Sequence, residues 1–154
     1  MLPFKKILCP IDFSEPSHEA LKVASELAMK FEAELTVIHA IPDIPKATPP
    51  DPAIEATETY LQYQRELERD SQRLLSDAVH RFTSHELKVR EIIESGDAAL
   101  IVAKIAEEED ADLVVLSTHG RTGWRRFVFG SVAERIVRHA QCPVLTIQTP
   151  HIAE

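Results

Sequence analysis

Short apolar runs alternate with longer segments of helical periodicity along the chain. The apolar runs predict strands at residues 6–11, 35–41, 87–93, 113–116 and 144–147. Apolar residues at helical spacing predict helices at residues 15–31, 54–82, 98–109 and 131–139. Because strands that alternate with helices favour right-handed crossovers, we predict an α/β fold with a five-stranded, mostly parallel sheet and helices on both faces.

Particular residues define the ends and faces of these elements. Ser14 and Asp97 are residue types that cap helix N-termini, and each directly precedes a predicted helix. The strand at 113–116 contains no polar residue, so we expect it to be buried on both faces. The long helix is predicted to have one apolar face, which carries Leu67, Leu74, Ala78 and Phe82.

A cluster of prolines separates the second strand from the long helix. It comprises Pro42, Pro45, Pro49, Pro50 and Pro52. Proline lacks the N–H group that a helix interior or a central strand needs, so residues 42–53 are predicted to form an extended loop. The whole chain, residues 1–154, is expected to be a single domain with this loop as an insertion.

The composition excludes several classes of protein. Of the 154 residues, 44% are hydrophobic and 27% are charged, which is typical of a globular chain and not of a disordered one. The formal net charge of −8 at pH 7 argues against nucleic acids and acidic membrane surfaces as partners. No apolar stretch reaches the roughly 20 residues of a membrane span, and the N-terminal residues lack the apolar region of a signal peptide. We therefore expect a cytoplasmic protein.

The two cysteines fit the reducing environment of the cytoplasm. Cys9 lies inside one apolar run and Cys142 precedes another, so both are expected to be buried thiols. A Cys9–Cys142 disulfide would require the two residues to lie on adjacent strands, and nothing in the sequence favours it.

Candidate chemistry gathers in the loop that follows the fourth strand. Ligands of open α/β sheets bind beyond the carboxyl ends of the strands, where this loop begins. Ser131 with Glu134 matches a capping box, with Ser131 as N-cap, and a helix N-terminus attracts anions. A loop that is rich in glycine and arginine and leads into a helix N-terminus suits a polyphosphate, although the same residues could simply turn the chain. The loop, residues 117–131, holds three of the four glycines and three arginines: Gly120, Gly123, Gly130, Arg121, Arg125 and Arg126.

Other polar residues admit both a structural and a functional interpretation. Asp12 ends the first strand, where it could form a turn before the helix or accept hydrogen bonds from a ribose or an adenine amino group. We expect His119 to stabilise the loop and His39 to be structural. The sequence contains no phosphate-binding P-loop, no dinucleotide fingerprint, no metal-ligand spacing of histidines and no hydrolase elbow.

Taken together, these features resemble the universal stress proteins over essentially the whole chain. The matching segments are Ile7-Leu-Cys-Pro-Ile-Asp-Phe-Ser14, His39-Ala-Ile41, Gly96-Asp97, Ser117-Thr-His-Gly-Arg-Thr-Gly123, Gly130-Ser-Val-Ala-Glu134 and Cys142-Pro-Val-Leu-Thr-Ile147. The resemblance implies a Rossmann-like fold, similar to that of the adenine-nucleotide α-hydrolases. It also implies a homodimer that forms through the C-terminal strand, residues 143–148.

One residue departs from the motif of the nucleotide-binding branch of that family. The motif is Gly-x-x-Gly, nine residues, then Gly-Ser/Thr, and here Gly120 is followed by nine residues and by Gly130-Ser131. Its first glycine corresponds to Ser117. Serine would weaken binding if the position required a positive φ, and would be tolerated if it required only a small residue. We favour tolerance, because Gly120, Gly130 and Ser131 are intact.

The resemblance implies that the chain binds ATP or AMP, with Mg²⁺ as an accompanying ion. Asp12 and the residues beside it would hold the adenine and the ribose, and the loop and the following helix would hold the phosphates. The residues implied are Pro10, Ile11, Asp12, Ala40, Leu116, Ser117, Thr118, Gly120, Arg121, Gly130, Ser131 and Val132.

Three functions follow from these patterns. The first is a nucleotide-binding stress-response or regulatory protein with little or no turnover, because no catalytic base is evident. The second is a weak ATP hydrolase, for which His119 and Asp12 are the only candidate groups. The third is a nucleotide-free dimeric module that acts through an unidentified protein partner, which the departure at Ser117 keeps open.

Overall fold

The computed structural model describes residues 2–43, 58–119 and 129–149. The elements are β1 (Lys6–Pro10), α1 (Glu15–Phe31), β2 (Glu34–Ile41), α3 (Glu58–Phe82), β3 (Val89–Ser95), α4 (Ala98–Glu108), β4 (Leu113–Ser117), α5 (Ser131–His139) and β5 (Val144–Ile147). All the neighbouring strands pair in parallel, in the order β3-β2-β1-β4-β5. The predicted α/β fold and element order are confirmed, and the observed boundaries differ from the predicted ones by one or two residues. Residues 54–57, predicted to begin the long helix, lie outside the described residues. Most of the proline cluster lies outside the described residues.

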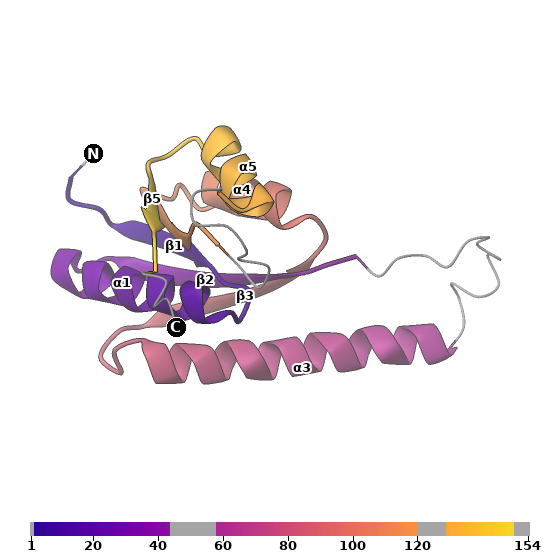
Figure 1. Ribbon diagram of the computed structural model, residues 1–154. Coiled ribbons are helices and arrows are strands. Elements are labelled where there is room, and N and C mark those ends of the chain that lie inside the picture. The colour runs from indigo at the N-terminus through magenta and orange to yellow at the C-terminus, as the bar shows by residue number, and fades with distance from the viewer. Residues whose placement is uncertain (1, 44–57, 120–128, 150–154) are drawn as a thin grey trace, which may run out of the picture.

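The sheet is covered by a pair of helices on each face. Figure 1 shows α1 and α3 below the sheet and α4 and α5 above it. Alternate residues of the central strands point to opposite layers, as strand geometry requires. On β4, Leu113 and Val115 pack with α1 and α3, whereas Val114 and Leu116 pack with α4 and α5. The expectation that β4 is buried on both faces is therefore confirmed.

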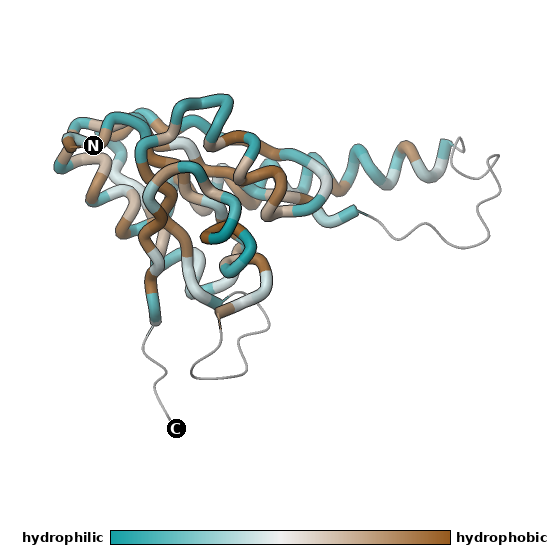
Figure 2. The backbone as a smooth tube through the Cα atoms, turned by 90° about the horizontal axis from the view of Figure 1, so that it is seen from above, coloured by the Kyte–Doolittle hydropathy of each residue, from teal (hydrophilic) through white to brown (hydrophobic). Residues whose placement is uncertain are grey.

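The buried face of α3 differs from the prediction in one position. Leu74 is 46% exposed, whereas the next residue, Leu75, is completely buried. The line of contact runs through Ser71, Leu75 and Ala78. Apolar spacing alone favoured Leu74, because a buried serine one turn before Leu75 gives no apolar signal. The N-terminal end of α3 extends past the sheet (Figure 1), and this part of the helix is mostly hydrophilic (Figure 2).

The cysteines occupy different environments. Cys9 is fully buried on β1, and burial raises the pKa of its thiol. Cys142 is only half-buried, so the expectation of two buried thiols is wrong for this residue. Both thiols are free, and β4 lies between β1 and β5, so the two residues are not on adjacent strands.

The order of the strands determines where a ligand can bind. The chain moves outward from β1 through β2 to β3, and then returns to the other side of β1 through β4 and β5. At such a reversal, the loops after the two central strands diverge and leave a crevice beyond their carboxyl ends.

Among the described residues, no helix is long and apolar enough to span a membrane.

Candidate functional site

A cavity of about 260 Å³ lies in the crevice between the ends of β1 and β4. This volume is close to the lower end of the range of roughly 300–1,000 Å³ that ligand pockets span. Strand ends form one side of the cavity, and α4 and α5 form the other. Its lining residues are Pro10, Ile11, Asp12, Ser17, Ile38, Ala40, Ala98, Val102, Leu116, Ser117, Thr118, His119, Gly130, Ser131, Val132, Ala133 and Ile136.

The structure brings the candidate residues together in this one cavity. Every described residue of the candidate set lines it: Pro10, Ile11, Asp12, Ala40, Leu116, Ser117, Thr118, Gly130, Ser131 and Val132. Gly120 and Arg121 lie outside the described residues, as do Gly123, Arg125 and Arg126. Four segments that are far apart in the sequence therefore meet at one place.

Sequence reasoning missed six residues of the lining, five of them apolar and one a serine. The missed residues are Ser17, Ile38, Ala98, Val102, Ala133 and Ile136. Two regularities could have indicated them. Ile38 is two residues before Ala40 and therefore shares its face of the strand. Val102 follows Ala98 by four residues, and Ile136 follows Ala133 by three, so each pair shares one face of its helix.

Asp12 forms a local turn at the edge of the cavity. Its Oδ1 accepts a hydrogen bond from the Ser14 N–H at 3.0 Å, and the Ser14 hydroxyl donates to the same oxygen. Ser14 in turn caps α1, because its Oγ accepts from the Ser17 N–H at 3.3 Å, which confirms Ser14 as N-cap. The turn and the cavity lining are compatible roles, because a carboxylate has further acceptor positions.

The charge of Asp12 acts on the neighbouring helix. The pKa of His18 is lowered, mainly because burial disfavours the imidazolium, while the Asp12 carboxylate acts in the opposite direction. The neutral imidazole is therefore favoured at pH 7. The first turn of α1 thus adds no full positive charge beside the Asp12 carboxylate.

The N-terminus of α5 points its backbone into the cavity without a side-chain cap. Gly130, not Ser131, is the N-cap residue, and no side-chain hydrogen bond caps the helix. The predicted capping box is wrong, because helical geometry already begins at Ser131, and Glu134 pairs with Arg138 instead. The N–H groups of the first turn have no acceptor within the helix, so this end retains its capacity for an anion.

The exit of β4 holds Gly130 in place. The Gly130 N–H donates to the Thr118 carbonyl oxygen at 2.8 Å. A Cβ on residue 130 would lie 3.2 Å from that oxygen, so a side chain here would press on the strand exit. The requirement for glycine is therefore one of close approach, since Gly130 has a φ of −57°.

Ser117 is accommodated without strain. Its φ is not positive. In the described segments, the non-glycine residues with a positive φ are Phe13, Glu32 and Asp110, and Ser117 is not among them. The Ser117 hydroxyl donates to the His119 carbonyl oxygen at 2.8 Å. His119 Nδ1 lies 2.9 Å from Thr118 Oγ1, which matches the expected loop-stabilising role. This geometry supports the tolerance of serine at position 117.

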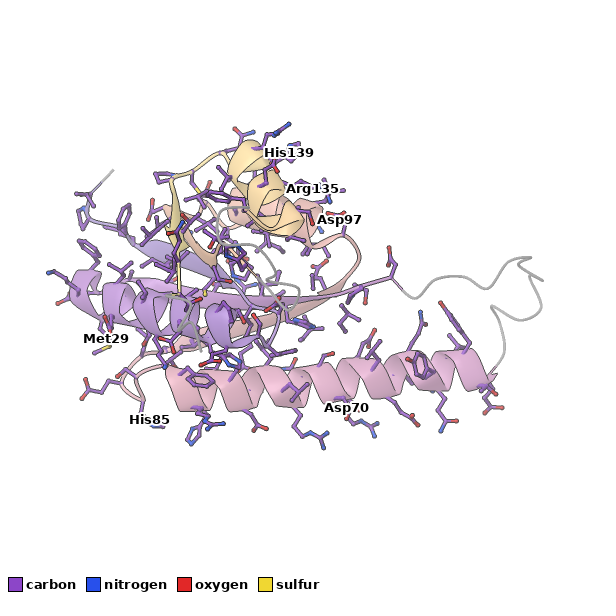
Figure 3. The ribbon with its side chains drawn as sticks, in the orientation of Figure 1. Met29, Asp70, His85, Asp97, Arg135 and His139 are labelled. Carbon is purple, nitrogen blue, oxygen red and sulfur yellow. The ribbon has the colours of Figure 1, made fainter. Side chains whose placement is uncertain are left out.

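An ion pair ties together the two helices that line the cavity. Asp97 caps α4, as predicted, because its Oδ1 accepts from the Leu100 N–H at 3.0 Å. Its other carboxylate oxygen lies 2.7 Å from Arg135 Nη1 on α5. Figure 3 shows these two side chains side by side.

His39, expected to be structural, places its Nδ1 2.9 Å from the Ile11 carbonyl oxygen.

The described residues hold no protein-built metal centre. No group of three or more histidine, cysteine, aspartate or glutamate side chains is arranged to hold a metal ion in the part of the chain that the structure describes. A divalent ion at this cavity would therefore depend on ligands other than such a cluster.

The fold is that of the α/β proteins with a parallel sheet whose strand order reverses, and the cavity lies at that reversal. The sequence pattern of the universal stress protein family matches residues 3–148. The chain belongs to this family. It is 32% identical over 147 residues to the universal stress protein MJ0531 of Methanocaldococcus jannaschii, covering 96% of this chain and 84% of that protein.

Solved structures share the fold. The protein MJ0577 superposes with a TM-score of 0.78 at 26% identity, over 96% of this chain and 98% of that one. The universal stress protein of Archaeoglobus fulgidus, solved in complex with dAMP, has a TM-score of 0.65 at 19% identity, over 96% and 99% of the two chains. An Arabidopsis thaliana family protein, solved with AMP bound, has a TM-score of 0.59 at 15% identity, over 96% and 93%.

Proposed function

We propose that the cavity binds an adenine nucleotide, ATP or AMP, and that the chain acts as a stress-response or regulatory protein with little or no turnover. The observation that carries the proposal is the cavity itself, which joins an apolar wall, a carboxylate and an uncapped helix N-terminus. Two structural neighbours that hold AMP or dAMP support the choice of an adenine nucleotide.

The apolar wall suits the base. Ile38 and Leu116 are buried on the strands, and Val102 is buried on α4. A purine ring would lie against these side chains, near the backbone of Ala40 and close to Pro10 and Ile11. Asp12 at the edge of the wall would accept hydrogen bonds from the ribose hydroxyls or from the adenine amino group.

The N-terminus of α5 suits the phosphates. The N–H groups of Ser131, Val132 and Ala133 would donate to phosphate oxygens, aided by the helix dipole. The Ser131 hydroxyl would add a further donor. Gly120 and Arg121 remain in the proposed site, and Mg²⁺ would be held mainly by the phosphates of ATP.

The polar residues at the cavity favour binding over hydrolysis. Hydrolysis needs a group that activates water and is aimed at the phosphate. The carboxylate of Asp12 is engaged by Ser14, and Nδ1 of His119 by the Thr118 hydroxyl. These contacts give both groups a structural role, in the Asp12 turn and in the loop after β4, and nucleotide binding needs neither group to activate water.

The proposal is tested by calorimetric titration of nucleotide-stripped protein with AMP and with ATP plus Mg²⁺. We expect dissociation constants on the order of micromolar for the parent. We also expect no measurable binding for Gly130→Val, whose side chain would enter the space between α5 and the Thr118 carbonyl. Asp12→Asn should weaken binding, whereas Asp70→Asn, which makes the same charge change at an exposed position of α3, should not.

Two results would change the conclusion. If the parent bound neither nucleotide, the nucleotide-free module with a protein partner would be the better interpretation. If the parent released phosphate at about 1 s⁻¹ or faster, and Ser131→Ala abolished that release, the chain would be an ATP hydrolase.

We also propose a homodimer that forms through residues 143–148, in the cytoplasm. β5 is an edge strand, and its Leu145 side chain is 37% exposed, so a second copy would cover an apolar edge. The two free thiols fit a reducing compartment. Sedimentation should show a dimer for the parent and a monomer for Leu145→Lys. The control Leu100→Lys, at an exposed leucine on α4, should remain dimeric, and a monomeric parent would refute this interface.

A further inference from the structure

A strained residue directly follows Asp12. Among the described residues, Phe13, Glu32 and Asp110 have positive φ angles of 64°, 53° and 51°. Glu32 and Asp110 lie at the C-terminal ends of helices, where the left-handed conformation is common. Phe13 lies between a strand and a helix start, where an aromatic residue rarely adopts this conformation. Such outliers persist when the surrounding structure holds them, and they cluster at functional sites.

His39 holds this turn at two points. Its ring packs on the Phe13 ring, with 4.2 Å between centroids and an interplanar angle of 35°. Its Nδ1 lies 2.9 Å from the carbonyl oxygen of Ile11. Because a carbonyl oxygen only accepts, Nδ1 carries the hydrogen and donates it. The residues on both sides of Asp12 are therefore fixed by one imidazole.

The position of His39 separates it from the ligand itself. Its neighbour on β2, Ala40, lines the cavity, whereas neither His39 nor Phe13 does. Successive residues of a strand point to opposite faces, so β2 forms the cavity wall with one residue and holds the Asp12 turn with the next. His39 thus acts on the ligand site through the backbone of the loop after β1.

We propose that His39 is a positioning residue that fixes the direction of the Asp12 carboxylate for ligand binding. The inference rests on the proposed nucleotide function. In the ligand-free protein it has a separate consequence: the Ser14 N–H, which donates to Asp12 Oδ1 at 3.0 Å, is protected only while the turn is held.

Two variants of His39 separate its ring from its donor. His39→Phe keeps a ring against Phe13 and removes the donor to Ile11. His39→Asn removes the ring and restores a donor close to the position of Nδ1. The first should disturb Asp12, and the second should rescue it in large part.

The first measurement is amide hydrogen exchange in the ligand-free protein. His39→Phe should accelerate exchange of the Ser14 amide about tenfold relative to the parent, because the turn opens more often. The Leu100 amide is the internal control, since it also donates to an aspartate carboxylate, that of Asp97 at the N-cap of α4. Its exchange rate should not change. Equal rates at Ser14 in parent and variant would overturn the proposal, whether or not the protein binds a nucleotide.

The second measurement is a double-mutant cycle with AMP as the probe. His39→Phe should weaken AMP binding about tenfold in the parent background and less than about twofold in an Asp12→Ala background. His39→Asn should stay within about threefold of the parent. Equal losses in the two backgrounds would show that His39 acts independently of Asp12, and would overturn the positioning role.

The two measurements distinguish the two proposals. Faster exchange of the Ser14 amide in His39→Phe, together with a parent that binds neither AMP nor ATP, would support the hold of His39 on the turn and refute the nucleotide function. Normal AMP binding by the parent, together with unchanged exchange of the Ser14 amide in His39→Phe, would support the nucleotide function and refute the hold of His39 on the turn.

Discussion

Gly130 is a helix N-cap residue that leaves the first-turn N–H groups of α5 available to a ligand. Replacing it with serine would supply a hydroxyl that competes for those N–H groups. We expect Gly130→Ser to be more stable than Gly130→Ala by about 1 kcal/mol, and to bind AMP more weakly than Gly130→Ala does. Chemical denaturation and calorimetry measure the two effects.

The pair of variants controls for the crowding of residue 130. Both add a Cβ that would lie 3.2 Å from the Thr118 carbonyl oxygen, so only the hydroxyl differs. Adenosine, which lacks the phosphate, should bind the two variants equally. If the serine variant bound AMP at least as tightly as the alanine variant, the phosphate would not lie at the α5 N-terminus.

The residues of the site could be predicted only in part. Asp12, Ser117 and Gly130 could be identified because the carboxyl ends of parallel strands meet at one edge, so residues after β1 and β4 must converge. The one-residue error at the α5 cap has a different origin, since Ser131 and Gly130 are both acceptable caps and only the backbone angles decide between them. The spacing of Ala98 and Val102 indicates that they share a face of α4, but it does not indicate that this face lines the cavity, because the rotation of α4 about its axis depends on its packing.

Among the elements, α3 offers a test of which face packs on the sheet. Leu75 is completely buried, and its neighbour Leu74 is 46% exposed. Leu75→Ala should therefore lower the free energy of unfolding by about 2–5 kcal/mol, whereas Leu74→Ala should lower it by about 0.5 kcal/mol or less. Urea denaturation of the two variants checks the difference. If Leu74→Ala lowered the free energy of unfolding more than Leu75→Ala did, the helix face predicted from apolar spacing would be the one that packs on the sheet.

The ion pair between α4 and α5 has a consequence for pH dependence. The pKa of Asp97 is lowered, first by the hydrogen bond from Arg135 and then by the Leu100 N–H. A lowered folded-state pKa means that the carboxylate stabilises the fold above its ordinary pKa. This contribution is lost as the pH falls through the lowered value. Arg135→Gln should therefore raise the pKa of Asp97, so that the stabilisation by its carboxylate is lost at a higher pH than in the parent.

A carboxyl NMR titration of Asp97 measures this change directly. Arg138→Gln is the matched control, because Arg138 pairs with Glu134 on the same helix and not with Asp97. An Asp97 pKa that was unchanged in Arg135→Gln would show that the ion pair does not persist in solution. The Leu100 N–H would then be the main cause of the lowered pKa.

The order of the elements was predictable, whereas their contacts were not. Short apolar runs and helical spacing are local properties of the sequence. They therefore predict the order of strands and helices, and the parallel sheet that follows from that order. The burial of Ser71 and the half-exposure of Cys142 depend on which elements lie against them. No local pattern contains that information.

At the scale of the whole molecule, the cavity is the place where separate parts of the fold meet. Asp12 follows β1, Ala40 belongs to β2, Ser117 ends β4, and Gly130 opens α5. A ligand that contacts all four binds the folded chain and not the unfolded one. Its binding therefore raises the free energy of unfolding of the entire domain.

The thermal stability of the protein should accordingly depend on nucleotide. At an AMP concentration of about one hundred times the dissociation constant, linkage adds roughly 2.7 kcal/mol, which for a chain of this length raises Tm by about 5–10 °C. Differential scanning calorimetry of the parent should show this rise, and Gly130→Val should show none. Leu145→Lys, which is directed at the proposed dimer edge and not at the cavity, should retain the rise at matched saturation. A parent Tm that did not respond to saturating AMP or ATP would mean that the cavity serves another ligand or none. The nucleotide-free module that acts through a protein partner would then be the better interpretation.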